Sequence, residues 1–360
     1  MGHIGTSLKK LTPASLSLQM EDWELEVGAL KKFVRLTPEN RGLFFAFLGK
    51  EADMDSYLTS PVYYALTGRK GLWVYQDGNT LVPICWHPNV DGQILVFPPR
   101  GEINPQVWKK LFTEIPTPPA GIRLARIKKD EIAAPLLNNI ESRFGRSITV
   151  SSTEERVLDW RYPVRTLSTE RVMKMEGRSF MRARNHLRQL DDRSITIRPL
   201  SKQFDSQIVA FANRWASRRT SNRDEIKELV SPYIETMNLL KDEVFRLGGH
   251  VFFVDGQIEA VTMWELPNTS LKVANAWVSL CNTEHNGLSE LVMKTTSEAL
   301  WERDVPYINY GGSETKGLDD YKNKYVPAYS VELRSFDVDI AGDDVILHSL
   351  ISIQGTRLAA

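Results

Sequence analysis

Alternating apolar and polar positions, typical of strands, are interspersed along this chain with segments in which apolar residues recur every three to four positions, typical of helices. In the first half, "GLWVY" and "TLVPICW" flank Asp77-Gly78-Asn79, which predicts a β-hairpin. "QILVF" and "GIRLARI" predict two more strands. Helical segments separate these strands, so the pattern predicts an α/β or α+β fold up to about residue 150.

Helices are expected on both sides of this hairpin. Thr37 is placed to act as an N-cap and Pro38 occupies the first helical position, which predicts a helix over residues 37–50. Helical spacing also recurs in residues 55–66, 104–115 and 133–145.

The second half shows a fuller form of the same succession. Asp255-Gly256 predicts the turn of a hairpin over residues 250–266. Helices are expected at 177–190, 204–219, 226–244, 287–304 and 318–325, and strands at 194–200, 269–280, 307–311 and 328–336. The repeated order predicts two related domains, at 20–155 and 156–340, with a C-terminal tail at 341–360.

Composition sets limits on the partners without naming one. The chain has 360 residues, and 45 basic residues balance 45 acidic ones. Cys85 and Cys281 lie in apolar runs, as buried free thiols do, and no run of about 18 apolar residues predicts a membrane span. No pair of histidines or cysteines has metal-ligand spacing. We expect a cytoplasmic monomer or weak homodimer with no metal, no DNA partner and no integral membrane association.

The neutral total conceals a basic segment. Residues 161–202 contain eleven Arg or Lys against four acids. Within it, Arg178, Arg182, Arg184 and Arg188 fall on an expected helix whose apolar residues form the opposite face. These arginines are candidates for contacts with nucleic-acid phosphates. The alternative is a set of surface charges paired with Glu176, Asp191 and Asp192.

The segment "YINYGGSETKGLDDYKNKY" (307–325) combines a strand, a glycine turn and a basic helix. Glycine at positions 311 and 312 allows a ligand to approach the backbone closely. Lys322 and Lys324 are two residues apart on the helix, so they project about 200° apart and only one can face a given carbonyl. The alternative is a solvated helix face on which Tyr321 and Tyr325 pack.

Two motifs resemble a known family. "GRSFMRARNHLRQL" (177–190) is similar to the basic Arg-Asn-His segment before the second domain of the bacterial lysyl-phosphatidylglycerol synthase C-terminal family. "NYGGSETKGLDDYKNKY" resembles that family's strand, small-residue turn, Gly-Leu pair and aromatic-Lys-x-Lys-aromatic ending, followed by Pro327. Both motifs have the expected separation, and the resemblance covers about residues 35–336.

The resemblance implies two tandem GNAT (acyl-CoA N-acyltransferase)-like domains, each a mixed, largely antiparallel sheet flanked by helices. It also implies transfer of an aminoacyl group from charged tRNA, with no cofactor. The family's best-known members carry a membrane domain that this chain lacks, so we expect a soluble small-molecule amine or hydroxyl acceptor. A lipid head group is the alternative acceptor.

The resemblance also implies site residues. Related peptidoglycan aminoacyltransferases use a helix lysine to polarise the ester carbonyl, a role that would fall to Lys322 or Lys324. Glu314 is a candidate general base, and with Ser313 it is placed to contact an amine. The other candidate substrate-binding residues are Asn309, Gly311, Gly312 and Tyr321. Arg178, Arg182, Arg184 and Arg188 are the candidate tRNA contacts.

The donor is also predicted from a missing motif. Acetyl-CoA enzymes of this fold carry an Arg/Gln-x-x-Gly-x-Gly/Ala loop that holds pyrophosphate at the start of the central helix. Here that position reads "NTEHNGLSEL", without the basic residue or the glycine pair. This favours charged tRNA over acyl-CoA as the donor. Two alternatives remain: an acyl-CoA-dependent N-acyltransferase with a degenerate loop, and a non-catalytic RNA-binding module.

Overall fold

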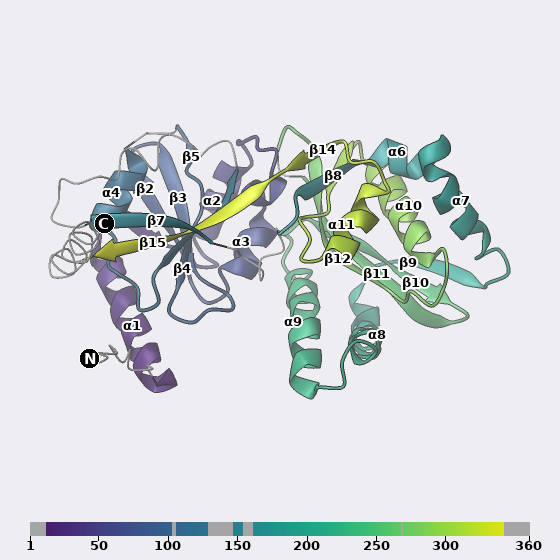
Figure 1. Cartoon of the computed structure of the whole chain (residues 1–360), viewed down its shortest axis with the longest axis horizontal. Helices are drawn as coiled ribbons and strands as arrows, with labels where there is room; N and C mark the ends of the chain where they lie inside the picture. The colour runs from purple at the N-terminus through teal and green to yellow at the C-terminus, as the bar shows by residue number, and fades with distance from the viewer. Residues whose placement is uncertain (1–11, 103–105, 129–146, 154–160, 268, 342–360) are drawn as a thin grey trace, which may run out of the picture. The chain divides into compact units, whose positions relative to one another are not determined.

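The chain divides into two compact units (Figure 1). The first consists of residues 1–37, 67–153 and 334–360, and the second of residues 38–66 and 154–333. The structure is a computed structural model that describes residues 12–102, 106–128, 147–153, 161–267 and 269–341.

The first unit is a mixed sheet. β2 (Leu72–Asp77) and β3 (Thr80–Trp86) form the predicted hairpin, and Gly78 in its turn has a φ of 63°. β4 (Ile94–Val96) runs parallel to β6 (Ile122–Lys128). The other strands are β1 (Phe33–Arg35), β5 (Arg100–Gly101), β7 (Ser147–Thr153) and β15 (Leu333–Ala341), and the order is β1-β2-β3-β4-β6-β15-β7 with β5 on β3.

Two helices of the first unit pack on this sheet. α1 (Pro13–Ala29) buries Trp23 against Trp73 and Trp86, with ring centroids 5.3 and 4.6 Å away. α4 (Val107–Glu114) lies between β4 and β6 in the sequence and contributes Leu111 and Phe112 to the same core. An aromatic and aliphatic core therefore joins these two helices to the sheet.

The second unit contains a larger sheet. β10 (Leu247–Val254) and β11 (Gln257–Glu265) form the hairpin predicted at Asp255-Gly256, and both turn residues have positive φ. β12 (Val273–Cys281) pairs antiparallel with β11 and parallel with β13 (Tyr307–Asn309). With β8 (Val164–Ser168), β9 (Ile195–Pro199) and β14 (Tyr329–Val331), the order is β14-β8-β13-β12-β11-β10-β9.

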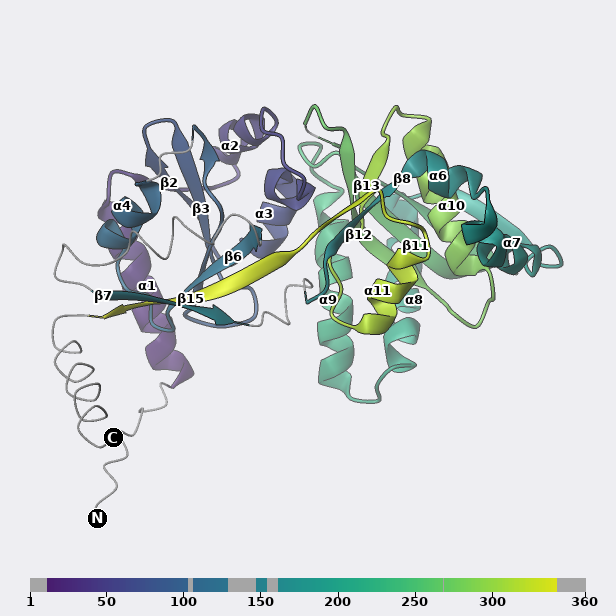
Figure 2. The same cartoon turned by 45° about the horizontal axis from the view of Figure 1, so that its top comes forward.

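Helices form two separate layers with this sheet. α6 (Thr169–Lys174), α7 (Met181–Arg188), α10 (Leu288–Trp301) and α11 (Lys316–Asn323) share a core that includes Phe180 and Met293. α8 (Asp205–Ser217) and α9 (Arg223–Leu239) share another core that includes Phe211 and Val261. Figures 1 and 2 both show α6, α7 and α10 gathered together, apart from α8 and α9.

The two units repeat one succession of elements. In each, an antiparallel hairpin is followed by a strand, a helix and a strand parallel to the previous one: β2-β3-β4-α4-β6 and β10-β11-β12-α10-β13. This arrangement confirms the predicted fold of two GNAT-like units, each a mixed sheet with helices.

The segment before the first hairpin belongs to the second unit. It contains α2 (Arg41–Leu48), the 3₁₀ helix η1 (Ser56–Thr59) and α3 (Pro61–Thr67). Phe45 packs against Phe245, with ring centroids 5.9 Å apart. β15, which follows the second unit in the sequence, joins the sheet of the first unit. The two units therefore differ from the contiguous domains 20–155 and 156–340 expected from the sequence.

Several predicted elements differ from the structure. α2 begins at Arg41 with Asn40 as its N-cap, so the start predicted at Thr37 and Pro38 is wrong. The chain is still held in the sheet at Leu36, whose N–H donates to the carbonyl oxygen of Leu72. α1 was not predicted, because its exposed Leu18 and Leu25 blur the helical pattern. The helix expected at 133–145 and the tail from 342 lie outside the described residues.

Among the described residues, no helix combines the length and the apolar character needed to cross a membrane.

Candidate active site

β12 and β13 part after only three residue pairs. The last pair is Asn275 with Asn309, but β12 continues to Cys281 while the chain after β13 turns away at Gly311. Gly311 has a φ of 69°, a conformation that suits glycine, and its N–H donates to Oδ1 of Asn309 at 2.7 Å. The chain therefore makes a fixed turn where the two parallel strands separate.

Lys322 lies beside this turn. It is 6% exposed, and its ammonium donates to the carbonyl oxygen of Gly311 at 3.3 Å and to that of Gly312. An ion pair of 2.9 Å between Arg165 on β8 and Asp319 fixes α11, the helix that carries Lys322. A buried positive charge thus lies at the end of β13.

Lys324 points elsewhere, as its helical spacing from Lys322 predicts. Its ammonium contacts Oε1 of Glu290 at 2.9 Å and lies 4.2 Å from the centre of the Tyr321 ring. The Tyr321 hydroxyl in turn donates to the carbonyl oxygen of Ser289 at 3.3 Å. Lys324 and Tyr321 therefore connect α11 to the first turn of α10.

Glu290 occupies the N-terminal turn of α10. Its carboxylate is buried and also lies 3.1 Å from Nδ1 of His186 on α7. Burial alone raises the pKa of Glu290, but the hydrogen bond and charge of Lys324, with His186 and Ser289, bring the pKa below its ordinary value. The positive end of the α10 dipole therefore already faces a carboxylate of the protein.

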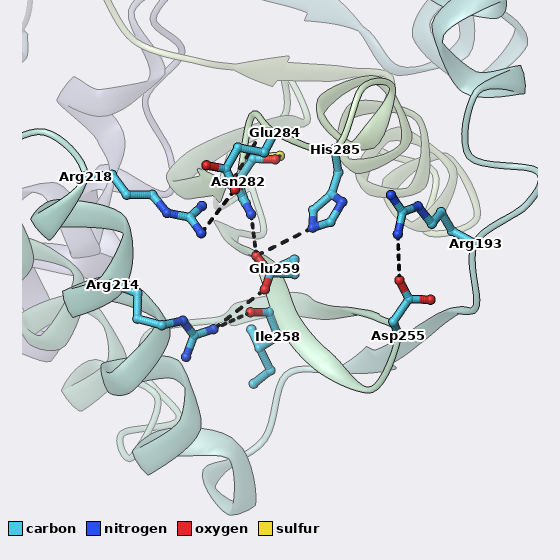
Figure 3. A network of polar contacts seen from close by, with 10 residues as sticks. Arg193, Arg214, Arg218, Asp255, Ile258, Glu259, Asn282, Glu284 and His285 are labelled. Atoms are coloured by element: carbon cyan, nitrogen blue, oxygen red, sulfur yellow. Dashed lines mark hydrogen bonds and ion pairs between the residues drawn. The ribbon is translucent and has the colours of Figure 1, made fainter.

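The loop before α10 is tied to the sheet by another carboxylate. Glu259 on β11 is buried and accepts from Nδ2 of Asn282 at 2.7 Å, while His285 and Arg214 lie 3.9 and 3.8 Å from its oxygens (Figure 3). Glu284 of the same loop pairs with Arg218 at 3.2 Å. This is the loop in which the sequence lacks a pyrophosphate-binding motif, and the interactions that hold it centre on carboxylates.

The residue at the end of this loop, Gly287, packs closely against the backbone of α7. Gly287 has a φ of 89°, and a Cβ there would lie 2.2 Å from the carbonyl oxygen of His186. The backbone of α7 therefore lies directly against the start of α10.

A chain of buried hydrogen bonds leads away from the turn. Nδ2 of Asn309 donates to Oγ of Ser56 at 3.0 Å, and that hydroxyl donates to Oδ1 of Asn275 at 2.6 Å. Nδ2 of Asn275 donates to Glu265 at 3.2 Å. These four side chains are all less than 5% exposed, so the turn after β13 is connected to η1 and β11 through the interior.

Glu265 ends this chain at the start of α3. Its carboxylate accepts from the N–H of Val62 at 3.1 Å, from Nε1 of Trp277 at 3.3 Å and from the hydroxyl of Ser60. Burial raises the pKa of Glu265, while these hydrogen bonds and that of Asn275 lower it in part. Glu265 therefore fastens the segment 38–66 to the sheet of the second unit.

The remaining candidate substrate residues lie around the turn. Ser313 is fully buried, and its hydroxyl has no hydrogen-bond partner within the described part of the chain. Its backbone pairs with Tyr162 in an isolated β-bridge. Glu314 is exposed. Burial and, to a smaller extent, the charge of Glu314 raise the pKa of Tyr233 on α9 to about 12.

The four arginines predicted to contact tRNA fall into two groups. Arg178, Arg182 and Arg188 are exposed on η2 and α7. The Arg184 guanidinium instead donates to the carbonyl oxygens of Met175 and Gly177, at 2.5 and 2.9 Å. Arg184 therefore fixes the connection from α6 to η2.

Sequence reasoning did not identify Ser56, Glu265 or Asn275 as site residues. Ser56 lies 219 positions from Asn275, and neither has a motif around it. A signal was present at Glu265, a carboxylate at the end of the apolar run "AVTMWE".

Neither a protein-family model nor a curated protein matches this chain. Solved structures do match. A conserved protein of unknown function from Bacteroides thetaiotaomicron superposes with a TM-score of 0.64 at 16% identity, covering 85% of this chain and 99% of that one.

Two further solved structures that match this chain are of the lysylphosphatidylglycerol synthetase type. The C-terminal (DUF2156) domain of a proposed lysylphosphatidylglycerol synthetase from Agrobacterium fabrum has a TM-score of 0.51 at 12% identity, covering 92% of this chain and 96% of that one. L-PGS from Bacillus licheniformis has a TM-score of 0.52 at 14% identity, covering 86% and 93%. In structure, this chain resembles the lysylphosphatidylglycerol synthetase domains that its two motifs resemble in sequence.

Proposed function

We propose that this protein is an aminoacyltransferase that moves an aminoacyl group from charged tRNA to a small-molecule amine or hydroxyl acceptor. The observation that carries the proposal is the buried ammonium of Lys322 beside the Gly311-Gly312 turn, where β12 and β13 separate. The resemblance in fold to lysylphosphatidylglycerol synthetase domains supports a transferase of this class.

The state of the α10 N-terminus supports charged tRNA as the donor rather than acyl-CoA. A pyrophosphate needs free N–H groups and positive potential at a helix N-terminus. In this protein the carboxylate of Glu290 lies there, and the preceding loop contains Glu284 and is bound to Glu259. A second set of negative charges would meet repulsion at this position.

Lys322 is the better candidate for the charge that stabilises the oxyanion. Lys324 points away from the turn, toward the Glu290 carboxylate of α10 at 2.9 Å. The ammonium of Lys322 donates to two carbonyl oxygens of the turn, and these contacts hold it where the strands part. A fixed positive charge in a buried position stabilises a developing oxyanion more strongly than one in water.

The reaction then needs positioning more than chemical activation. The acceptor nitrogen or oxygen attacks the ester carbonyl, its proton passes to a base, and negative charge forms on the carbonyl oxygen near Lys322. The acyl–oxygen bond to the tRNA ribose breaks, and the ribose oxygen takes up a proton. Glu314, exposed beside Ser313, is the candidate base.

No covalent intermediate on the enzyme is needed. Burial, with the charges of Glu290 and Glu259, raises the pKa of Cys281 to about 12, and burial also raises that of Cys85. Both groups therefore remain thiols at neutral pH and are poor nucleophiles.

The exposed arginines of η2 and α7 supply the tRNA contacts in this proposal. Arg178, Arg182 and Arg188 present their side chains to solvent on one short segment. Arg184 contributes by fixing that segment through the carbonyl oxygens of Met175 and Gly177. Three phosphate contacts give an affinity that falls about 40-fold between 50 and 200 mM salt.

Donor binding tests the proposal directly. The full chain is titrated with charged tRNA, with the same tRNA uncharged, and with CoA, each at low and moderate salt. The proposal predicts salt-sensitive binding of tRNA, no binding of CoA, and loss of the aminoacyl group when an acceptor is added. CoA binding without tRNA binding would instead identify an acyl-CoA-dependent enzyme. Equal binding of both tRNAs with no loss of the aminoacyl group from any acceptor mixture would identify an RNA-binding module.

A further inference from the structure

A cavity of about 640 Å³ lies in the second unit, beside the residues that precede β12 and β13. Its walls come from the residue before β10 (Arg246), the loop between β11 and β12 (Pro267, Lys272) and the residues after α10 (Arg303, Val305). β13 runs from Tyr307 to Asn309, so Val305 of the cavity precedes this strand and Gly311 of the turn follows it. The cavity is therefore separate from the turn that holds Lys322.

Three cationic side chains from three different elements line this cavity: Arg246, Lys272 and Arg303. None of them forms an ion pair with any of the residues that the structure describes. Elsewhere on the second unit, exposed cations such as Lys316 and Arg193 pair with neighbouring carboxylates. The three cations are thus available to a ligand.

The two arginines of the cavity have N–H groups that their existing hydrogen bonds do not use. The Arg246 guanidinium donates to the carbonyl oxygen of Pro267 at 2.9 Å, and that of Arg303 donates to the carbonyl oxygen of Ala299 at 2.5 Å. A guanidinium carries five N–H groups, so each arginine is held in place by one bond and keeps others for an anion.

The charge balance of the cavity is positive. Asp304 is its one lining carboxylate, which leaves an excess of two positive charges among the lining residues. The pKa of His250 on β10 is consistent with this positive charge. Burial is the main cause that lowers this pKa; the charge of Arg303 lowers it further, and the charge of Glu302 opposes the shift. An anion with more than one negative charge suits this site best.

The cavity also has apolar walls and more room than a simple anion needs. Leu266, Pro267 and Val305 supply the apolar surface. A volume of this size is in the range of sites for small organic ligands. We propose that the cavity binds a phosphate group carried by a nucleotide-sized body, with Arg246, Lys272 and Arg303 on the phosphate and the apolar walls against the body.

A phosphate of this kind has two sources: a free phosphorylated metabolite, or a nucleotide of a bound RNA. Calorimetric titrations of the full chain with AMP, adenosine, pyrophosphate and uncharged tRNA distinguish them. Arg246→Gln and Lys272→Gln remove one charge each from the cavity. Lys227→Gln is the matched control, because Lys227 is exposed on α9 and contacts only the adjacent Asp224 among the described residues.

The proposal predicts that AMP and pyrophosphate bind and that adenosine binds at least about tenfold more weakly. Each cavity variant weakens AMP binding by about tenfold, while Lys227→Gln leaves it unchanged. If AMP does not bind but tRNA affinity falls in the two cavity variants alone, the phosphate is that of an RNA. Thermal unfolding of each variant shows whether its fold is intact.

Two results would overturn the proposal. One is AMP binding that the cavity variants leave unchanged. The other is the absence of binding by every phosphate compound, together with tRNA binding that the cavity variants do not alter. Neither result bears on the aminoacyltransferase proposal, since the cavity and the turn that holds Lys322 lie at opposite ends of β13.

Discussion

Nδ2 of Asn309 donates a hydrogen bond of 3.0 Å to Oγ of Ser56, although the two residues lie 253 positions apart in the sequence. The same Asn309 accepts from the N–H of Gly311, in the turn whose carbonyl oxygens hold Lys322. The segment that precedes the first hairpin of the chain therefore supports the geometry of the candidate active site.

Replacing Asn309 tests this support. Asn309→Ala leaves the N–H of Gly311 without its buried acceptor, which we expect to destabilise the protein by about 1–3 kcal/mol and to lower the rate of aminoacyl transfer. Urea unfolding and transfer kinetics measure the two effects. Asn213→Ala, at an exposed position of α8, is the control and should change the free energy of unfolding by less than about 0.5 kcal/mol. Equal stability of the two variants would contradict the role of Asn309.

The packing of α7 against α10 predicts an effect at Gly287. Gly287→Ala combines a positive φ of 89° with a Cβ only 2.2 Å from the carbonyl oxygen of His186, so the two backbones must move apart. We expect a loss of more than about 3 kcal/mol in the free energy of unfolding. Gly78→Ala is the control, since its φ is 63° but its Cβ would meet open space; it should lose only about 1–2 kcal/mol. Equal losses of unfolding free energy in the two variants would show that the close approach of α7 to Gly287 does not affect stability.

The lowered pKa of Glu290 predicts how stability depends on pH. A carboxyl group that binds its proton more weakly in the folded state stabilises the fold above its unfolded pKa, and that stability is lost as the pH falls through the folded pKa. Urea unfolding from pH 7 down to pH 3 should therefore show a smaller loss in Glu290→Gln than in the unaltered protein. Parallel curves for the two proteins would exclude this contribution.

The exposed arginines predict a change in the salt dependence of tRNA binding. Arg182→Gln should reduce the slope of log K against log salt concentration by about 1, because one phosphate contact is lost. Arg193→Gln is the control: Arg193 is also exposed, but it pairs with Asp255 at 3.0 Å. A slope that is unchanged in Arg182→Gln, or reduced equally in both variants, would place the tRNA elsewhere.

Local patterns were enough to predict the framework of each unit. Asp77-Gly78-Asn79 and Asp255-Gly256 identified both hairpins, because two-residue turns that require a positive φ are strongly enriched in Gly, Asn and Asp. Helical spacing alone predicted that Lys322 and Lys324 point in different directions, which their contacts with Gly311 and Glu290 confirm.

Contacts between distant segments could not be predicted in the same way. The position of Ser56 beside Asn275 and Asn309 depends on where the segment 38–66 packs, and nothing in its local sequence specifies that. The role of Arg184 was hidden for a related reason. Its neighbours in the sequence suggested a row of phosphate contacts, but the turn after α6 brings the carbonyl oxygens of Met175 and Gly177 within reach of its guanidinium.

The central claim is that Lys322 stabilises the oxyanion during transfer from charged tRNA. Lys322→Met keeps the length and apolar stem of the side chain but removes its charge, and Lys316→Met, on the exposed face of α11, is the matched control. Both variants are first checked for thermal unfolding and tRNA binding.

The measurement that tests this claim most directly is the rate at which each variant releases the aminoacyl group from charged tRNA, with a filtrate of small metabolites as the acceptor source. We predict that Lys322→Met loses at least about 100-fold in rate with tRNA affinity unchanged, while Lys316→Met keeps the original rate. A folded, tRNA-binding Lys322→Met variant with the original rate would contradict the account.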